Sequence, residues 1–260
     1  MFGPPPTVLA FPLAIVLLAG LLGLLVGSFI GAAACRLPRG EGVVTGRSHC
    51  DGCGRTLSPV QLVPVLSFLV QRGRCRACGA PIDRVQPIAE IGGALIAMIA
   101  AIFSPDWMML LLTMVFCWQL WLLALLDIRD FWLPRGLVAL LAISAVLPFL
   151  DGGPSIDGAL WQVAGGALGF VLTAAPALFY RRVRGVEGMG AADPWLLAAI
   201  GLWLGPFGVV FTLLAGAGGG LLLAIAAAVS GRPIAPDTAF PLGAFLALAA
   251  IAVRLAAPVL

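Results

Sequence analysis

Two aspartates lie at the ends of long apolar segments of the sequence. Asp127 follows the apolar run 107–126, and Asp193 precedes Pro194 at the start of another apolar run. A carboxylate at the end of a membrane-length helix is costly to keep, so such residues are functional candidates by default. Two carboxylates that share one site can serve as acid and base toward a water molecule. We therefore predict that Asp127 and Asp193 form a functional pair.

Four cysteines form the second candidate site. Two Cys-x-x-Cys motifs contain Cys50 and Cys53 and, after 21 intervening residues, Cys75 and Cys78. Each motif lets two thiolates reach one ion, and four thiolates make the closed tetrahedral site of structural zinc. Two disulfides or free thiols are the alternatives, and a cytoplasmic location would keep the thiols reduced and favour zinc. We interpret His49 as a solvent-facing neighbour of this zinc site.

The composition indicates which elements must position these side chains. Of the 260 residues, 61% are hydrophobic and 10% are charged, which excludes an ordinary soluble domain. The first apolar run lacks a basic segment before it, so we interpret it as a membrane helix and not as a signal peptide. Eight apolar runs lie at about residues 8–34, 87–103, 107–126, 136–150, 159–180, 194–204, 207–229 and 240–259.

We therefore predict an all-α polytopic membrane protein with about eight transmembrane helices. The first transmembrane helix is expected at residues 1–35, a small zinc-binding domain at 36–86, and a transmembrane domain with both aspartates at 87–260. This division follows the change in composition, because the segment between the first two apolar runs is polar and holds four of the six cysteines.

The arginines predict the orientation of the chain. With Met1 outside, the predicted inner loops carry 14 of the 15 arginines, including Arg232, and the predicted outer loops carry none. The zinc domain and both aspartates are then expected at the cytoplasmic face. Arginines of the polar segment are expected to contact anionic lipid headgroups. Nucleic acid is not an expected partner, because this segment is tethered to the membrane at both ends; an acidic small molecule or peptide stays an open alternative.

The two aspartates have different structural alternatives. Asp193 followed by proline suits a helix N-cap, so it could simply cap its helix. Asp127 ends a helix, where the macrodipole disfavours a carboxylate, so a structural role explains it poorly. From these two helix ends we predict that Asp193 is the ionised base and that Asp127 carries the shared proton.

Several short motifs together resemble one known family, the type IV prepilin peptidases, which are bifunctional leader peptidase/N-methyltransferases of bacterial inner membranes. The resemblance spans most of the chain, and three positions differ from the family pattern, namely Arg135, Ala192 and Trp195. An alanine at position 192 would cost about 1 kcal/mol if its φ were positive. The similar motifs are Gly27-Ser28-Phe29-Ile30, Arg36 to Glu41, the two Cys-x-x-Cys motifs, Val63 to Ser67, Arg72 to Arg76, Asp127 with Leu133-Pro134, and Gly188 to Asp193.

The resemblance implies a membrane-embedded aspartyl endopeptidase that removes the basic leader of prepilins or type II secretion pseudopilins at the cytoplasmic face of the inner membrane. Its catalytic residues would be Asp127 and Asp193. The N-terminus would be periplasmic. A divergent non-catalytic homologue is one alternative, and a proton-coupled transporter or scaffold with a zinc-binding cytoplasmic domain is the other.

The resemblance also implies a second activity, methylation of the new N-terminus by S-adenosylmethionine. Glu41 and Glu90, which flank the polar segment, are the candidates for contact with the amine. The alternative for both is an ordinary surface or interface charge.

Overall fold

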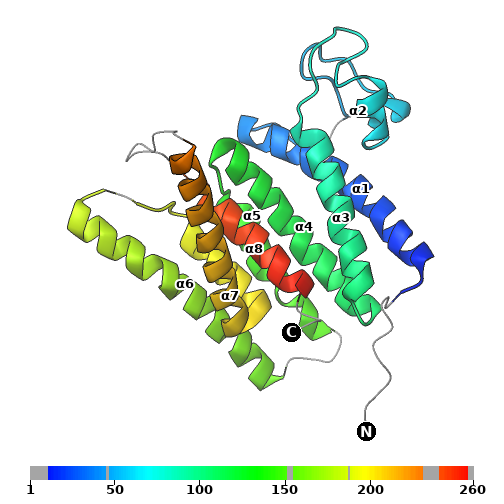
Figure 1. The fold of residues 1–260 in the computed structure, drawn as a ribbon. Helices are drawn as coiled ribbons and strands as arrows, with labels where there is room; N and C mark the ends of the chain where they lie inside the picture. Colours follow the sequence, from blue (N-terminus) through cyan, green and yellow to red (C-terminus); the bar gives the residue numbers. More distant parts are fainter. Residues whose placement is uncertain (1–10, 45–46, 151–154, 187, 231–239, 257–260) are drawn as a thin grey trace. The chain divides into compact units, whose positions relative to one another are not determined.

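The computed structural model describes residues 11–44, 47–150, 155–186, 188–230 and 240–256 of the chain. Within these ranges the regular structure consists of eight α-helices and three short 3-10 helices, and the only β contacts are two isolated bridges (Figure 1). The predicted all-α fold is therefore confirmed. The predicted ends of the first and last apolar runs, residues 8–10 and 257–259, and also Arg232, lie outside the described residues.

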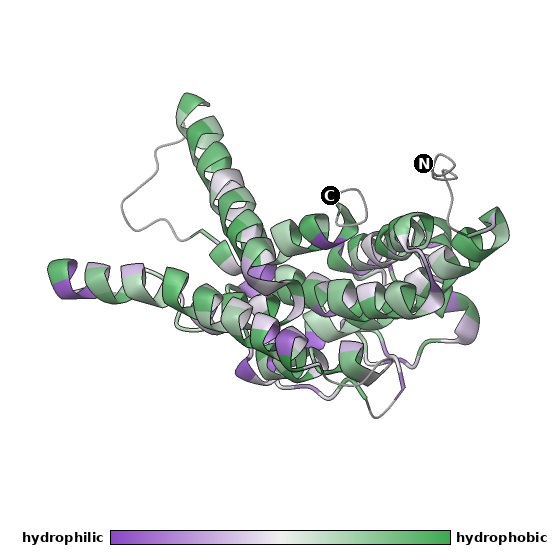
Figure 2. Cartoon of the chain, turned by 90° about the horizontal axis from the view of Figure 1, so that it is seen from below, coloured by the Kyte–Doolittle hydropathy of each residue, from purple (hydrophilic) through white to green (hydrophobic). Residues whose placement is uncertain are grey.

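Five of the helices are long and apolar enough to cross a bilayer, which confirms a multi-pass membrane protein. Figure 2 shows that hydrophobic residues dominate the helices along their length. The five are α1 (Leu13–Arg36), α3 (Val85–Phe103), α4 (Trp107–Asp130), α6 (Ile156–Arg184) and α7 (Asp193–Val229); α5 (Arg135–Ser144) and α8 (Leu242–Ala256) are shorter apolar helices.

Two of the predicted apolar runs, 194–204 and 207–229, belong to the single element α7. Its backbone is non-helical at Gly205, where φ is 69° and ψ is −177°, and Pro206 follows. Proline lacks the N–H that would continue the helix and clashes with the preceding turn, and glycine alone adopts this φ/ψ region without strain. A Cβ at position 205 would also collide with the indole nitrogen of Trp161. The kink therefore divides α7 into two apolar halves.

The chain forms two compact units, of which the first ends at Met114 and the second begins at Val115. In the first, α1 and α3 pack closely because Gly27 leaves no side chain between the helices; a Cβ there would lie 2.5 Å from the Ala89 carbonyl oxygen. In the second, α6 and α7 cross at Gly165 and Gly201 for the same reason. The predicted boundaries at residues 35 and 86 stay predictions.

The polar segment between α1 and α3 has little regular structure. It contains the short helices η1 (Leu37–Arg39), η2 (Pro59–Leu62) and α2 (Leu66–Val70), and isolated bridges close its two cysteine-bearing turns. The last short helix, η3 (Leu147–Leu150), follows α5 in the second unit.

Candidate active site and metal centre

The second unit brings the two aspartates together. Asp127 lies in the last turn of α4 and Asp193 is the first residue of α7, and their side chains are 6% and 5% exposed. Gly243, at the start of α8, lies against both. A Cβ built on it would be 3.1 Å from Oδ2 of Asp127 and 3.2 Å from Oδ1 of Asp193. The two carboxylate oxygens are therefore separated by no more than the sum of these distances.

Each carboxylate accepts a hydrogen bond from the backbone. Oδ2 of Asp127 accepts the N–H of Ala244 at 2.7 Å, and Oδ2 of Asp193 accepts the N–H of Gly190 at 3.1 Å. Ala244 belongs to the first turn of α8, whose unpaired N–H groups and positive dipole end stabilise a carboxylate. Asp127 therefore lies at the C-terminal end of α4, as predicted, but the start of α8 offsets the unfavourable dipole at that end.

The capping alternative for Asp193 is also wrong. The N-cap of α7 is Ala192, no side chain caps this helix, and the Asp193 carboxylate instead bonds to the loop residue Gly190. Ala192 has φ of −91°, so alanine adopts this position without the strain that a positive φ would impose. The difference from the family pattern at position 192 therefore has no backbone cost.

Gly243 is a site residue that the sequence reasoning missed. The signal available was Pro241 and then Gly243 at the start of an apolar run, which indicates a helix start but not what the helix meets. A Cβ at position 243 would lie 2.5 Å from Cδ1 of Leu133, which would have to shift, and would crowd both carboxylates. The start of α8 therefore closes one side of the acid pair.

A groove of about 210 Å³ adjoins the pair within the second unit. It runs between the C-terminal half of α6 and residues 188–191, and Gly190 and Pro194 connect it to Asp193. Apolar side chains line it together with one guanidinium, that of Arg181. An apolar groove with one cationic side chain suits a peptide segment that is mostly apolar.

The four predicted cysteines form a cluster in the first unit. The Sγ atoms of Cys50, Cys53, Cys75 and Cys78 all lie within 4.8 Å of one another. All four are free thiols, so the disulfide alternative is wrong. Four sulfur atoms that converge on one point could hold a metal ion, and soft thiolates in tetrahedral geometry favour zinc.

Backbone N–H groups stabilise negative charge on two of these sulfur atoms. The N–H of Gly52 points at Sγ of Cys50 at 3.4 Å, and that of Ala77 points at Sγ of Cys75 at the same distance. Hydrogen bonds from the backbone of Cys78 and of Ala77, and from the Cys50 thiol, lower the pKa of Cys75 to about 6. For Cys78 a hydrogen bond from the Ala80 backbone is outweighed by the Cys53 thiol and by burial, which raise the pKa of Cys78 to about 11. The thiolate form that a metal ion requires is therefore favoured at Cys75.

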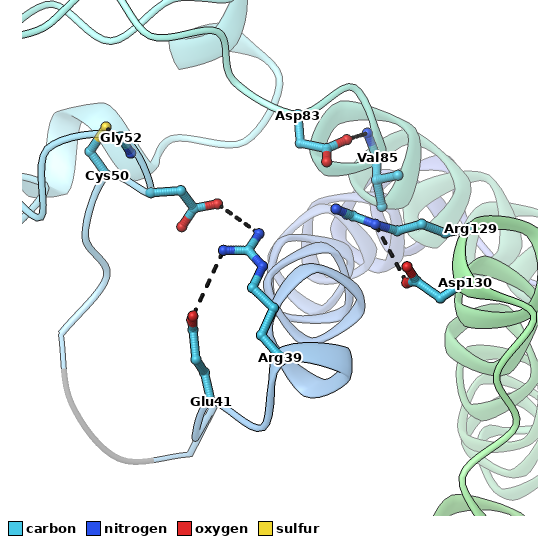
Figure 3. Close-up of polar contacts among 9 residues, drawn as sticks. Arg39, Glu41, Cys50, Gly52, Asp83, Val85, Arg129 and Asp130 are labelled. Atoms are coloured by element: carbon cyan, nitrogen blue, oxygen red, sulfur yellow. Dashed lines mark hydrogen bonds and ion pairs between the residues drawn. The ribbon is translucent and has the colours of Figure 1, made fainter.

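Glu41 and Glu90 lie in different surroundings. Glu41 is part of a half-exposed ion-pair group in which Arg39 contacts it at 3.8 Å and contacts Asp51 at 3.2 Å (Figure 3). Glu90 is 4% exposed and accepts hydrogen bonds from the N–H of Val65 at 2.6 Å and from Nε2 of Gln86 at 3.0 Å. A surface charge therefore fits Glu41 but not Glu90, for which an interface charge stays the open alternative.

Comparison with protein-family models gives two matches that follow one another along the chain. Residues 21–104 match a model described as the bacterial peptidase A24 N-terminal domain, and residues 114–255 match a model described as the type IV leader peptidase family. No solved structure matches the chain significantly.

Curated proteins of similar length align over most of the chain. A protein of Pseudomonas aeruginosa is 32% identical over 92% of this chain and 89% of its own length, and one of Stutzerimonas stutzeri is 31% identical over the same shares. A protein of Bacillus subtilis is 34% identical over 71% of this chain and 72% of its own length. All three are named prepilin leader peptidase/N-methyltransferase.

Proposed function

Because the chain belongs to the type IV leader peptidase family, as its motifs predicted, we propose that it is a membrane aspartyl endopeptidase that removes the basic leader of prepilins or type II secretion pseudopilins. The observation that carries this proposal is the pair of buried carboxylates, Asp127 and Asp193, on either side of Gly243. A proton relay calls for acids at different depths, so two acids that converge on one point favour a peptidase over a transporter.

The two carboxylates divide the work of hydrolysis. Two acids that share a site cannot both ionise cheaply, so one holds a proton while the other accepts one from water. The water oxygen attacks the scissile carbonyl carbon, and the protonated carboxyl donates to the carbonyl oxygen. The C–N bond then breaks, and its nitrogen takes the proton that the base removed from water. The adjoining groove suits the apolar part of the substrate.

We propose that the reaction takes place at the cytoplasmic face of the bacterial inner membrane, with the N-terminus periplasmic. The bias of arginines toward one set of predicted loops supports this orientation. Proteolysis of the polar segment 36–84 in membrane vesicles tests it. We expect cleavage in inverted vesicles, and cleavage only in right-side-out vesicles would overturn the orientation.

We further propose that the chain holds a structural zinc ion on its four clustered cysteines and that it methylates the newly exposed N-terminus. The names of the similar proteins and the free thiols support these proposals. S-adenosylmethionine would supply the methyl group, whose bond to sulfur breaks as the bond to nitrogen forms, so that sulfur keeps the electron pair and the amine loses a proton.

Mass measurement of a prepilin produced together with this protein tests the peptidase. We expect wild-type protein to remove the leader, and Asp127→Asn or Asp193→Asn to lower cleavage by at least about 10³-fold, because each variant removes one half of the acid–base pair. Asp130→Asn is the matched control, since Asp130 is an exposed acid of the same helix that pairs with Arg129 at 3.5 Å. Near-normal cleavage by either variant of the pair would refute the aspartyl mechanism.

A further inference from the structure

A cavity of about 170 Å³ lies within the first unit, away from any residue used in the hydrolysis above. Its walls include Ser28 of α1, Gln86 and Glu90 of α3, the cysteine-bearing turns through Cys50 and Cys75, and the short helices η2 and α2. The cavity is therefore bounded on one side by the cysteine cluster and on the other by two packed helices.

Glu90 is the buried charge of this cavity. It lines the cavity, is 4% exposed, and accepts one hydrogen bond at each carboxylate oxygen, from Gln86 and from Val65. A carboxylate offers about four acceptor positions, so acceptor capacity remains. Among the described residues no cationic side chain forms an ion pair with it. A buried charge without a counter-charge is expensive, so this site suits a cationic ligand.

Gln86 orients Glu90 toward α1. Its Nε2 donates to Oε1 of Glu90 at 3.0 Å and lies within hydrogen-bonding distance of the carbonyl oxygen and the hydroxyl of Ser28, at 3.0 and 3.1 Å. Because an amide group has two N–H bonds, three acceptors already exceed its donors. Gln86 therefore has no donor to spare for a ligand, and Glu90 is left as the group at this end that binds one.

A strained turn is attached to the same carboxylate. Val65 has φ of 59° and ψ of −51°, and the N–H of Leu66 bonds to the carbonyl oxygen of Pro64 at 2.5 Å. These values describe a γ-turn of the rare, strained kind, here with a β-branched residue at its centre. The hydrogen bond from the Val65 N–H to Glu90 holds the turn in place. Strain of this kind concentrates at ligand-binding sites.

The charges around the cavity describe the ligand. Its lining contains three carboxylates, those of Asp51, Asp83 and Glu90, and one guanidinium, that of Arg36. Arg39 pairs with Asp51 at 3.2 Å, and Asp83 accepts the N–H of Val85 at 2.9 Å. A ligand with a cationic group for Glu90 and a carboxylate for Arg36 is therefore complementary to this lining. S-adenosylmethionine has that composition, because it combines a sulfonium, an ammonium and a single carboxylate.

We propose that this cavity binds S-adenosylmethionine with the sulfonium facing Glu90, an inference that rests on the N-methyltransferase activity proposed above. Glu41 does not line the cavity and has no part in this binding. The site thus separates the two acids that the sequence could not distinguish.

Isothermal titration of the full-length protein in detergent with two ligands tests the proposal. The second ligand is S-adenosylhomocysteine, which lacks the methyl group and has a neutral sulfur. In Glu90→Gln we expect S-adenosylmethionine to bind roughly 10- to 100-fold more weakly, while S-adenosylhomocysteine loses much less, because only the charged sulfur is recognised by the carboxylate. In Glu41→Gln we expect both ligands to bind as in wild type. Unchanged binding in Glu90→Gln, or an equal loss for both ligands, would overturn the proposal.

A second pair of variants covers the case in which Glu90→Gln does not fold. Ala32→Leu places a larger side chain in the cavity wall on α1 and should abolish binding of both ligands, whereas Ala14→Leu, at an exposed position of the same helix, should leave it unchanged. Normal binding by Ala32→Leu would refute the site. Methylation of a co-produced prepilin is measured separately. A wild-type protein that binds S-adenosylmethionine but methylates nothing would refute the proposed activity and leave the binding site standing.

Discussion

Replacement of Gly243 by alanine offers a direct test of whether the start of α8 completes the acid pair. The added methyl group would lie 2.5 Å from Cδ1 of Leu133, 3.1 Å from an oxygen of Asp127 and 3.2 Å from an oxygen of Asp193. Carbon atoms in contact normally lie about 3.5–4.0 Å apart, so the Leu133 side chain must move and the carboxylates are crowded. The methyl group also occupies the space between the two acids that an attacking water needs.

The expected effects on stability and on catalysis differ in size. Overpacking of this kind costs about 1–3 kcal/mol, while replacing a helical glycine by alanine returns about 1 kcal/mol, so the fold should survive with a small net loss. A displacement of catalytic groups by about 1 Å costs on the order of 10²-fold in rate. We therefore expect Gly243→Ala to remain folded and to cleave a co-produced prepilin about 100-fold more slowly.

The matched control for this variant is Gly136→Ala. Gly136 is likewise the second residue of an apolar helix, α5, and a Cβ there meets nothing within 4 Å. Cleavage rates are compared by the fraction of prepilin processed over time, and folding by thermal unfolding in detergent. If Gly243→Ala cleaves as fast as Gly136→Ala, the argument that α8 closes the site is refuted.

Two further predictions concern the metal and the acid pair. Purified protein should contain one zinc equivalent, and a variant with both Cys50→Ser and Cys75→Ser should lose it while keeping its helical circular dichroism, since helix hydrogen bonds in the membrane do not depend on the metal; full zinc content in that variant would contradict the four-thiolate site. Asp127→Asn and Asp193→Asn should lower the thermal unfolding temperature by similar amounts, because each weakens one hydrogen bond from a backbone N–H. A much larger loss for Asp193→Asn would instead support the assignment of charge from the helix ends of the sequence.

The sequence predicted features that depend on local composition and spacing. Apolar runs of membrane length indicate helices because a helix must have about that length to cross the bilayer. Paired Cys-x-x-Cys motifs converge because each turn presents two thiols on one side. Both features need only residues that are near one another in the chain or are repeated within it. The motif around Asp193 could be found in the same way, since Gly190 and Asp193 contact each other across three residues.

Contacts between distant segments were not predictable in this way. Asp127 and Ala244 are 117 residues apart, and nothing in the local pattern of α8 shows that its first turn faces a carboxylate. The same holds for Glu90, whose partner Val65 lies 25 residues before it in a segment with little regular structure. The sequence reasoning therefore treated Glu41 and Glu90 alike, although only tertiary packing decides which of the two is buried.

The surroundings of the two aspartates also change the view of how they share a proton. The sequence placed one acid at a favourable helix end and the other at an unfavourable one, which predicted a fixed division into base and acid. In the structure each carboxylate accepts one backbone N–H through its Oδ2, from α8 in one case and from the loop before α7 in the other. The helix ends therefore no longer distinguish the two acids. What separates them is their position relative to each other and to the bound peptide, so the proton belongs to the pair and can change sides during each turnover.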